Sequence, residues 1–164
     1  MKKLLIFSLF LSFSILVCAQ DATTFILVRH AEKAQDGTKN PPLNEAGKVR
    51  ANELAEMLSN QSVEALYSTD FKRTKETLKP IAVQQNLEIM TYDPFAKSEW
   101  LSSLIEKHGN ETIVISGHSN TIPGLANALL GASKFEQFDD SDYSNLIIIV
   151  ASKAGEGTLI RLKF

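Results

Sequence analysis

The sequence predicts an α/β fold, a three-layer α/β/α sandwich with a mostly parallel central sheet and a C-terminal hairpin. Strand and helix patterns alternate along the whole chain, which is typical of parallel strands joined by helices. Two of the strand patterns, Phe25–Val28 and Thr112–Ser116, are almost entirely apolar. Such runs are expected for strands that helices cover on both faces. No repeat, low-complexity tract or linker interrupts the sequence, so we expect a single domain over residues 20–164.

Residues 1–19 have the pattern of a secretory signal peptide. Two lysines precede an apolar stretch over residues 4–17, and small residues lead to a cleavage point after Ala19. The apolar stretch is shorter than the roughly 20 residues that a membrane-spanning helix needs. We therefore expect an exported protein, periplasmic or secreted, without stable membrane insertion unless Cys18 is lipidated. A lipoprotein is the less favoured alternative, because Val17 fits poorly before a lipidated cysteine.

Charge and cysteine content exclude several classes of function. Cys18 is the only cysteine, so a chain cleaved after Ala19 would keep 145 of the 164 residues and have neither a disulfide nor a thiolate nucleophile. Loss of Lys2 and Lys3 would change the formal net charge from −2 to −4. Because the sequence contains no basic tract, we expect neither nucleic acid nor an anionic membrane surface as a partner.

The elements follow one another in order along the chain. After the first strand and a polar loop, Asn44 is expected to cap a helix that continues to about Ser59, and Val63–Tyr67 to form the second strand. The segment Ser68–Asp70 is expected to cap the next helix, which Pro80 should kink or shorten. The remaining elements are a strand over Leu87–Tyr92, an amphipathic helix over Lys97–Lys107, a strand over Thr112–Ser116, a helix over about Thr121–Leu130, and a hairpin of Leu146–Ala151 and Thr158–Lys163.

Polar side chains follow each of the four strands that are predicted to be parallel. Arg29 and His30 end the first strand, Arg73 lies on the helix after the second, Asp93 follows the third, and His118 follows the fourth. The carboxyl ends of parallel strands meet at one rim of a sheet, where α/β proteins bind ligands. We therefore expect two imidazoles, two guanidiniums and a carboxylate to gather there. For an isolated Arg-His pair, a loop-capping role would be the simpler interpretation.

This set of side chains suits attack on a phosphoryl group. Arg29 and Arg73 can hold the non-bridging oxygens of a phosphate with planar, permanently charged donors. An imidazole with a free ring nitrogen is a competent nucleophile, and a second imidazole can stabilise the charge on the transferring group. An acid is then needed for the departing oxygen, a role worth about 10²–10⁴ in rate.

Three segments of the chain resemble the signature segments of the histidine phosphatase superfamily, also called phosphoglycerate-mutase-like. These segments are Leu27–Glu32, Tyr67–Thr77 and Val114–Asn120, and Leu43–Gly47 resembles the entry to the family's first helix. The resemblance covers essentially all of the chain after the predicted signal peptide, in order. It implies that His30 is transiently phosphorylated, that Arg29, Arg73 and His118 complete the phosphate pocket, and that the reaction requires no metal and no cofactor.

The chain departs from the family pattern at two places. Ala31 stands where the family usually has a glycine after the nucleophile, which raises the question whether the backbone there needs a positive φ. Ser119 and Asn120 follow His118, where many members have small residues. The side chains of Ser119 and Asn120 either donate to the phosphate or cap the following helix, and the sequence favours neither alternative.

The branch that the chain resembles has its general acid between the second and third signature segments. Asp93 is the best-placed candidate there, and the alternative is an ordinary Asp-Pro turn. Glu32 and Glu99 are reserves, but Glu32 is expected instead to orient the loop that carries Arg29, and Glu99 to lie on a solvated helix face. For other residues near these motifs we expect Lys33 and Lys72 at the surface, His108 at a helix end without a catalytic role, and Trp100 in the core.

The sequence therefore predicts an exported phosphatase that works through a phosphohistidine at His30. Its expected substrate is a phosphorylated small molecule, an envelope glycan or a phosphoprotein, and the fold also resembles the small phosphohistidine-protein phosphatases of the superfamily. The sequence makes no prediction about the oligomeric state.

Three other functions remain as alternatives. A mutase is less favoured, because the short segments after His30 and Asp93 leave little chain for an enclosing lid. A metal-dependent hydrolase with His30, His118 and Asp93 as ligands is disfavoured by two arginines that would repel the cation. The third alternative is a non-catalytic relative that binds phosphate or an anionic glycan.

Overall fold

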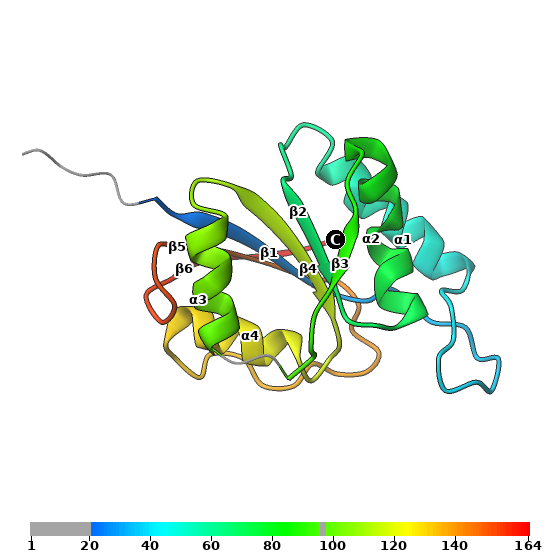
Figure 1. The fold of residues 1–164 in the computed structure, drawn as a ribbon. Helices are drawn as coiled ribbons and strands as arrows, with labels where there is room; N and C mark the ends of the chain where they lie inside the picture. The colour runs from blue at the N-terminus through cyan, green and yellow to red at the C-terminus, as the bar shows by residue number, and fades with distance from the viewer. Residues whose placement is uncertain (1–20, 96–97) are drawn as a thin grey trace, which may run out of the picture.

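A six-stranded sheet forms the centre of the molecule, in the order β3-β2-β4-β1-β5-β6 (Figure 1). The structure, a computed structural model, describes residues 21–95 and 98–164, so the predicted signal peptide over residues 1–19 lies outside the described residues. The strands are β1 (Thr23–Arg29), β2 (Ala65–Ser68), β3 (Ile89–Thr91), β4 (Thr112–Gly117), β5 (Asn145–Ala151) and β6 (Thr158–Lys163). Strands β1 to β4 run parallel, whereas β5 pairs antiparallel with both β1 and β6. The mostly parallel sheet and the C-terminal hairpin are therefore confirmed.

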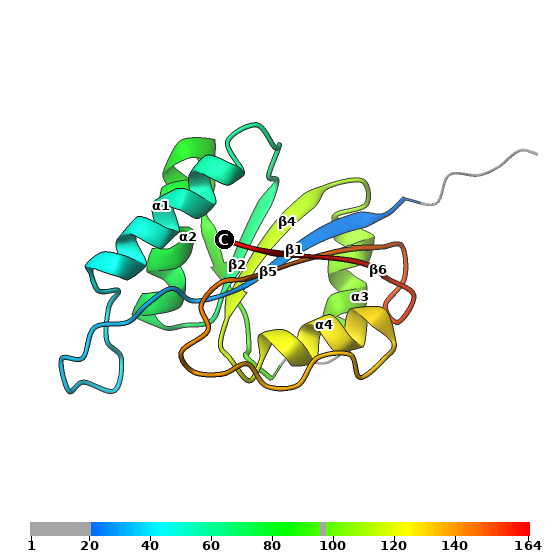
Figure 2. The same cartoon turned by 180° about the vertical axis from the view of Figure 1, so that it is seen from behind.

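Two helices cover each face of this sheet. Helices α1 (Glu45–Met57) and α2 (Lys72–Gln85) lie on one face, and α3 (Ser98–Lys107) and α4 (Ile122–Leu130) lie on the other (Figures 1 and 2). Alternate side chains of β1 enter two apolar cores: Phe25 and Leu27 pack with α3 and α4, and Ile26 and Val28 pack with α1 and α2. Burying each of these side chains contributes roughly 1.5–3 kcal/mol. The predicted three-layer sandwich is confirmed, with β1 buried on both faces.

Helix α1 begins where the sequence predicts. Asn44 is its N-cap, and the side-chain Oδ1 of Asn44 accepts a hydrogen bond of 2.8 Å from the backbone N–H of Gly47. The helix ends at Met57, two residues before the predicted end. Within the two described ranges, none of the helices combines the length and the apolar composition needed to cross a bilayer.

Helix α2 differs from the prediction at its start and at Pro80. It begins at Lys72, and its N-cap is Phe71, which makes no side-chain capping bond. The predicted cap, Ser68–Asp70, is wrong because Ser68 is still part of β2 and the hydroxyl of Thr69 is bonded elsewhere. The helix also continues through Pro80 to its end, so the predicted shortening is wrong. The proline ring removes one backbone N–H donor, and the apolar contacts of α2 with the core outweigh that single loss.

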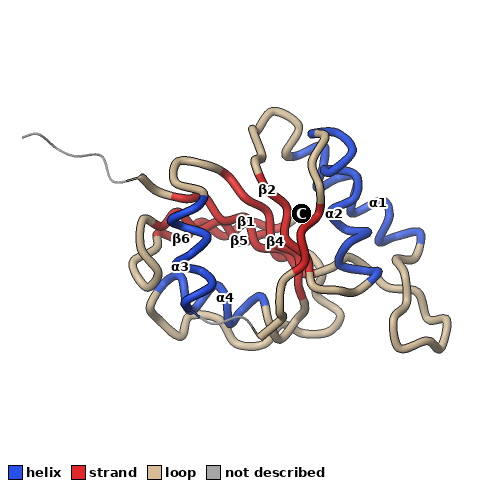
Figure 3. Tube along the Cα trace, viewed as in Figure 1, coloured by secondary structure: helices blue, strands red, loops and turns tan. Residues whose placement is uncertain are grey.

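The ends of the parallel strands lie along one rim of the sheet. β3 is shorter than predicted and forms an edge of the sheet, paired with β2 alone. Figure 3 shows the loops that follow the parallel strands gathered along the lower rim. The backbone of Glu32, just past β1, is tied to the start of α1, where the N–H of Asn44 donates to the Glu32 carbonyl at 2.9 Å. Strand β1 holds the chain before His30, and this contact holds it after His30.

Gly47 allows the close approach of α1 to that loop. A Cβ added at Gly47 would collide with the backbone carbonyl of Glu32, whereas a Cβ at Gly124 in α4 would meet no atom within 4 Å. We expect Gly47→Ala to lower the free energy of unfolding by about 1–3 kcal/mol, because backbone atoms cannot move aside easily. Gly124→Ala, the matched helical control, should raise it by up to about 1 kcal/mol.

Urea unfolding curves of the two variants and of the unsubstituted protein measure this difference. If Gly47→Ala proved as stable as Gly124→Ala, helix α1 and the loop after His30 would not be in the close contact described.

Candidate active site

A cleft of about 480 Å³ opens at the rim where the parallel strands end. The side chains of Arg29, His30, Arg73 and His118 all line it, and these four come from the predicted positions after β1, β2 and β4. The lining also includes Lys33, Phe71, Ser119, Asn120, Asp140 and Tyr143. The structure therefore brings together four of the five side chains of the predicted constellation, although 88 positions separate the two histidines in the sequence.

The backbone and the ring of His30 are both fixed. Its N–H donates to the carbonyl of Gly117 at 2.8 Å, which continues the pairing of β1 with β4 beyond the strand. Its ring Nδ1 lies 2.8 Å from the carbonyl oxygen of Ala31. A carbonyl can only accept, so the Nδ1 must carry the proton, which leaves Nε2 with a free lone pair. His30 is 4% exposed, and its side chain lines the cleft.

Ala31 fits its position without backbone strain. It is absent from the residues with positive φ, which among the described non-glycine residues are Asn86 and Asn110. Its N–H donates to the hydroxyl of Thr77 at 3.0 Å, and its methyl group is buried. The departure from the family glycine is therefore compatible with this loop.

The second imidazole, His118, lies beside the first. The two ring centroids are 5.5 Å apart in an edge-on arrangement. The Nε2 of His118 lies 3.0 Å from the hydroxyl of Thr69, which itself donates to Thr74, and its Nδ1 lies 3.5 Å from Nη2 of Arg73. Since a guanidinium can only donate, Nδ1 is the acceptor and the Nε2–H donates to Thr69. This network holds the His118 ring in one orientation.

Arg29 is buried at the end of β1 and is held by the segment between α4 and β5. Its Nη1 donates to the backbone carbonyls of Asp139 at 2.9 Å and Asp142 at 3.2 Å. The guanidinium carbon lies 4.2 Å from the ring centroid of Tyr143, and Nη2 lies 3.5 Å from a carboxylate oxygen of Asp140. Neither Tyr143 nor the carbonyls were identified from the sequence, because this segment has no regular apolar pattern.

Two charged donors in the cleft have no protein partner. The Nε atoms of Arg29 and Arg73 are buried and make no hydrogen bond within the described part of the chain. A buried donor without a partner costs about 1–3 kcal/mol, and more when it is charged. Both guanidiniums line the cleft, so an anion bound there would lie against two permanent positive charges, and this geometry favours an anionic ligand.

The surroundings keep both imidazoles neutral. Burial lowers the pKa of His30 to about 3, and the cations Arg29 and Arg73 act in the same direction, against the hydrogen bond to Ala31. Burial, Arg73 and Arg29 lower the pKa of His118 to about 4. At neutral pH the lone pair of His30 Nε2 is therefore available for attack on a phosphorus atom.

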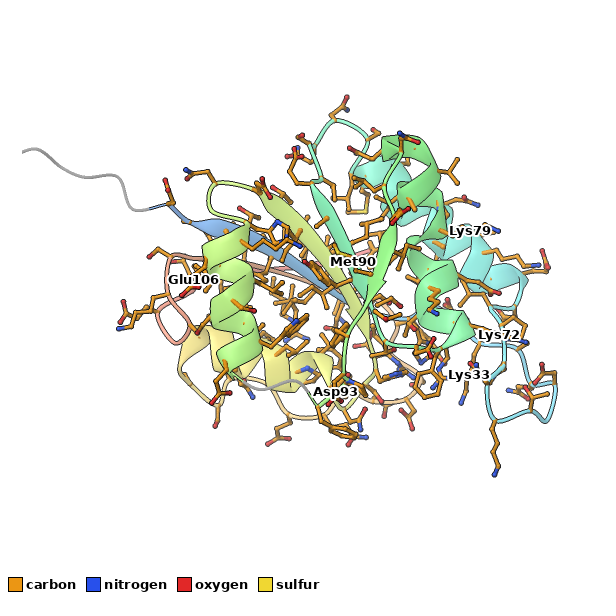
Figure 4. The ribbon with its side chains drawn as sticks, viewed as in Figure 1. Lys33, Lys72, Lys79, Met90, Asp93 and Glu106 are labelled. Atoms are coloured by element: carbon orange, nitrogen blue, oxygen red, sulfur yellow. The ribbon has the colours of Figure 1, made fainter. Side chains whose placement is uncertain are left out.

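Asp93 is the member of the predicted constellation that the structure does not bring into the cleft. Its carboxylate is exposed and accepts a 2.9 Å hydrogen bond from the N–H of Phe95, and it is not among the described lining residues. Figure 4 shows the labelled Asp93 at the rim, in the turn that follows β3. This geometry is that of the turn residue, the alternative that the sequence left open. Asp93 is also not placed beside the two imidazoles, as the metal-dependent alternative requires.

Ser119 and Asn120 both line the cleft. The Ser119 hydroxyl donates to Asp140 at 2.8 Å, and the N-cap position of α4 belongs to Thr121. Of the two alternatives for Ser119 and Asn120, capping of the helix is therefore not observed. Lys33 lines the cleft as well, whereas Lys72 is not among the lining residues.

Glu32 ties the loop that carries Arg29 to helix α1. Its carboxylate pairs with the side chain of Arg50 on α1, at 2.8–3.0 Å, and not with Arg29. His108 is buried directly after helix α3, between the Tyr67 hydroxyl at 2.9 Å and Glu111 at 2.6 Å. These contacts give Glu32 and His108 structural roles outside the cleft.

Comparison with known proteins identifies proteins of similar sequence and fold. Residues 25–96 match the family model of the histidine phosphatase superfamily (branch 1). The chain is 28% identical to phosphoserine phosphatase 1 of Hydrogenobacter thermophilus, over 73% of this chain and 83% of that protein. Among solved structures, the protein histidine phosphatase SixA complexed with tungstate has a TM-score of 0.71 at 19% identity, with 85% of this chain and 96% of that one covered.

A second solved structure has the same fold. Phosphoserine phosphatase from Entamoeba histolytica, in complex with 3-phosphoglyceric acid, has a TM-score of 0.69 at 16% identity. The match covers 87% of this chain and 97% of the Entamoeba protein. These structural matches confirm the phosphoglycerate-mutase-like α/β architecture that the sequence predicts.

The lowered pKa of His30 makes folding stability depend on pH. The pKa is about 3 in the fold and about 6.5 in the unfolded chain, so between these values the unfolded state binds more protons. Stability is therefore lost as the pH falls through 6.5 toward 3, with a contribution from His30 of up to about 1.4 kcal/mol per pH unit. His118 acts in the same direction.

We expect His30→Gln, which cannot titrate, to reduce this slope by about 1 kcal/mol per pH unit. The free energy of unfolding measured with urea at several pH values between about 7 and 5, in buffers without phosphate, gives both slopes. An equal slope in the variant and the unsubstituted protein would contradict the neutral, buried imidazole.

Proposed function

The chain belongs to the histidine phosphatase superfamily, and we propose that it hydrolyses a phosphomonoester or a phosphoprotein through a covalent phosphohistidine at His30. The observation that carries this proposal is the cleft itself. His30, with its unprotonated Nε2, lines a cleft together with Arg29, which is buried, and Arg73, which is partly buried. The two guanidiniums suit the non-bridging oxygens of a phosphoryl group.

The first step is attack of His30 Nε2 on phosphorus. The bond from phosphorus to the leaving oxygen breaks as the new bond to nitrogen forms, and Arg29 and Arg73 hold the non-bridging oxygens while charge builds on them. Because Nδ1 keeps its bond to the Ala31 carbonyl, the ring stays oriented throughout. The same bond stabilises the partial positive charge that the ring acquires.

In the second step, water attacks the phosphohistidine and the imidazole leaves. The surroundings that lower the pKa of His30 also make its Nε2 a weak base, which suits a leaving group. A phosphoryl group on Nε2 is stabilised where a proton is not, because the phosphoryl oxygens are negatively charged and lie between two guanidiniums. The site therefore disfavours a proton on Nε2 but accepts a phosphoryl group there.

The relatives favour hydrolysis over the alternatives. The three similar proteins described above are phosphatases by name, which favours hydrolysis over phosphoryl transfer within one substrate and over binding alone. Phosphorylated hydroxy compounds and phosphorylated proteins are both supported as substrate classes by those names. A phosphorylated envelope glycan remains a proposal that rests on the predicted export.

The phosphohistidine can be tested directly. Rapid mixing with 4-nitrophenyl phosphate should release a burst of nitrophenol, and quenching should trap a phosphorylated protein that loses its label in acid and keeps it in base. His30→Ala should abolish both signals, because no other free imidazole nitrogen is positioned between the two arginines. His108→Gln, which removes a buried imidazole outside the cleft, should keep the label.

Turnover or acid-labile labelling that persists in His30→Ala would rule out this mechanism. A label lost equally from both variants would point to a folding defect, and circular dichroism of each variant separates that case.

We also propose that the protein is exported and that residues 1–19 are removed. The basic, apolar and small-residue order of that segment supports this proposal. Mass spectrometry of the mature protein should find Gln20 at its N-terminus. A product that still carries residues 1–19, or one that begins at an acylated Cys18, would contradict cleavage after Ala19.

A further inference from the structure

Asp140 places a carboxylate at the mouth of the cleft. It is the one acidic side chain among the described residues that line this space. It lies between α4 and β5, and 82% of its side chain is exposed. The carboxylate Oδ1 accepts the hydroxyl of Ser119 at 2.8 Å and lies 3.5 Å from Nη2 of Arg29.

The backbone around Asp140 is anchored to the residues that form the phosphate pocket. Arg29 Nη1 holds the carbonyls of Asp139 and Asp142 on either side. The N–H of Phe138 donates to the carbonyl of Ser119 at 2.9 Å. The Asp140 side chain is exposed, but its backbone is held in place, because Arg29 and Ser119 bind the segment on both sides of it.

We propose that Asp140 is the proton donor for the leaving oxygen, an inference that rests on the phosphatase function proposed above. In-line attack by His30 directs the leaving oxygen away from the ring and toward the open mouth, where Asp140 lies. Without substrate, the carboxylate lies 3.5 Å from Nη2 of Arg29. A bound phosphoryl dianion interacts with the Arg29 guanidinium in place of the carboxylate, and it adds a negative charge beside Asp140. Both effects favour the protonated carboxyl.

The proposed step is balanced in atoms and charge. As the bond from His30 Nε2 to phosphorus forms, the electron pair of the breaking P–O bond stays on the leaving oxygen. That oxygen takes the proton of Asp140 and departs as an alcohol. In the second step the Asp140 carboxylate removes a proton from the attacking water, the P–N bond breaks, its electron pair returns to Nε2, and Asp140 is protonated again.

A proton donor matters most for a poor leaving group. Alkoxide leaving groups need protonation, with an expected gain of about 10²–10⁴ in rate, whereas dinitrophenolate leaves without it. We expect Asp140→Asn to lower kcat/KM for an alkyl phosphate such as O-phosphoserine by about 10²–10⁴-fold. The loss for 2,4-dinitrophenyl phosphate should be at least tenfold smaller than the loss for the alkyl ester. kcat/KM is the suitable constant because it covers the steps up to formation of the phosphohistidine.

Asp93→Asn is the matched control. It changes the carboxylate that the sequence favours as the acid, and its amide oxygen can still accept the N–H of Phe95. Asp93→Asn should change kcat/KM for the two esters by the same factor. A selective loss for the alkyl ester in Asp93→Asn would assign the proton to Asp93 and overturn the proposal.

Two further results would also overturn it. One is an Asp140→Asn variant that loses activity on both esters equally or on neither. The other is an unsubstituted protein that hydrolyses the activated ester alone, since such an enzyme has no working proton donor. The phosphatase function fails separately, if the unsubstituted protein hydrolyses neither ester and forms no phosphohistidine.

Discussion

The site depends on the parallel pairing of β1 with β4. In this register Arg29 lies opposite Gly117, and the N–H of His30 donates to the carbonyl of Gly117. His118 is the next residue, so the two imidazoles are brought to one place by backbone hydrogen bonds alone. A slip of one residue would turn Phe25 and Leu27 to the opposite face of the sheet and take both cores apart. The energy that fixes the catalytic geometry is therefore the burial of the sheet.

Arg29 and Arg73 lie close together at this rim, and the repulsion between two like charges, together with their burial, makes this arrangement unfavourable without a ligand. Burial and the neighbouring Arg29 lower the pKa of Arg73, which shows that the charged form of Arg73 is disfavoured where it lies. Two carbonyls and the Tyr143 ring partly offset this cost for Arg29. The remaining cost is relieved when an anion binds. The site thus favours an anionic ligand over a neutral one, because a neutral molecule would leave the charges of both arginines uncompensated.

Most of the sheet and four side chains of the site are predictable from the sequence, because apolar runs and strand ends are local signals. Pro80 and the start of α2 are mispredicted because tertiary contacts outweigh one lost backbone bond and a missing cap. Asp93 is placed correctly at a strand end, but its carboxylate turns to a nearer donor, the N–H of Phe95. The contacts of Arg29 with residues more than 100 positions away leave no local pattern at all.

Arg29 connects the two kinds of chemistry that a phosphatase needs. Its Nη1 holds the segment that carries Asp140, its Nη2 faces the carboxylate, and its side chain lines the cleft proposed for the phosphoryl group. Any anion that binds at this guanidinium therefore acts on Asp140 through a single delocalised cation and over a short distance. A lysine at this position would offer one point charge, which could not hold the segment and the phosphoryl group at the same time. Under the proposed mechanism, substrate bound at the Arg29 guanidinium therefore favours a protonated Asp140. This effect does not require contact between the substrate and Asp140.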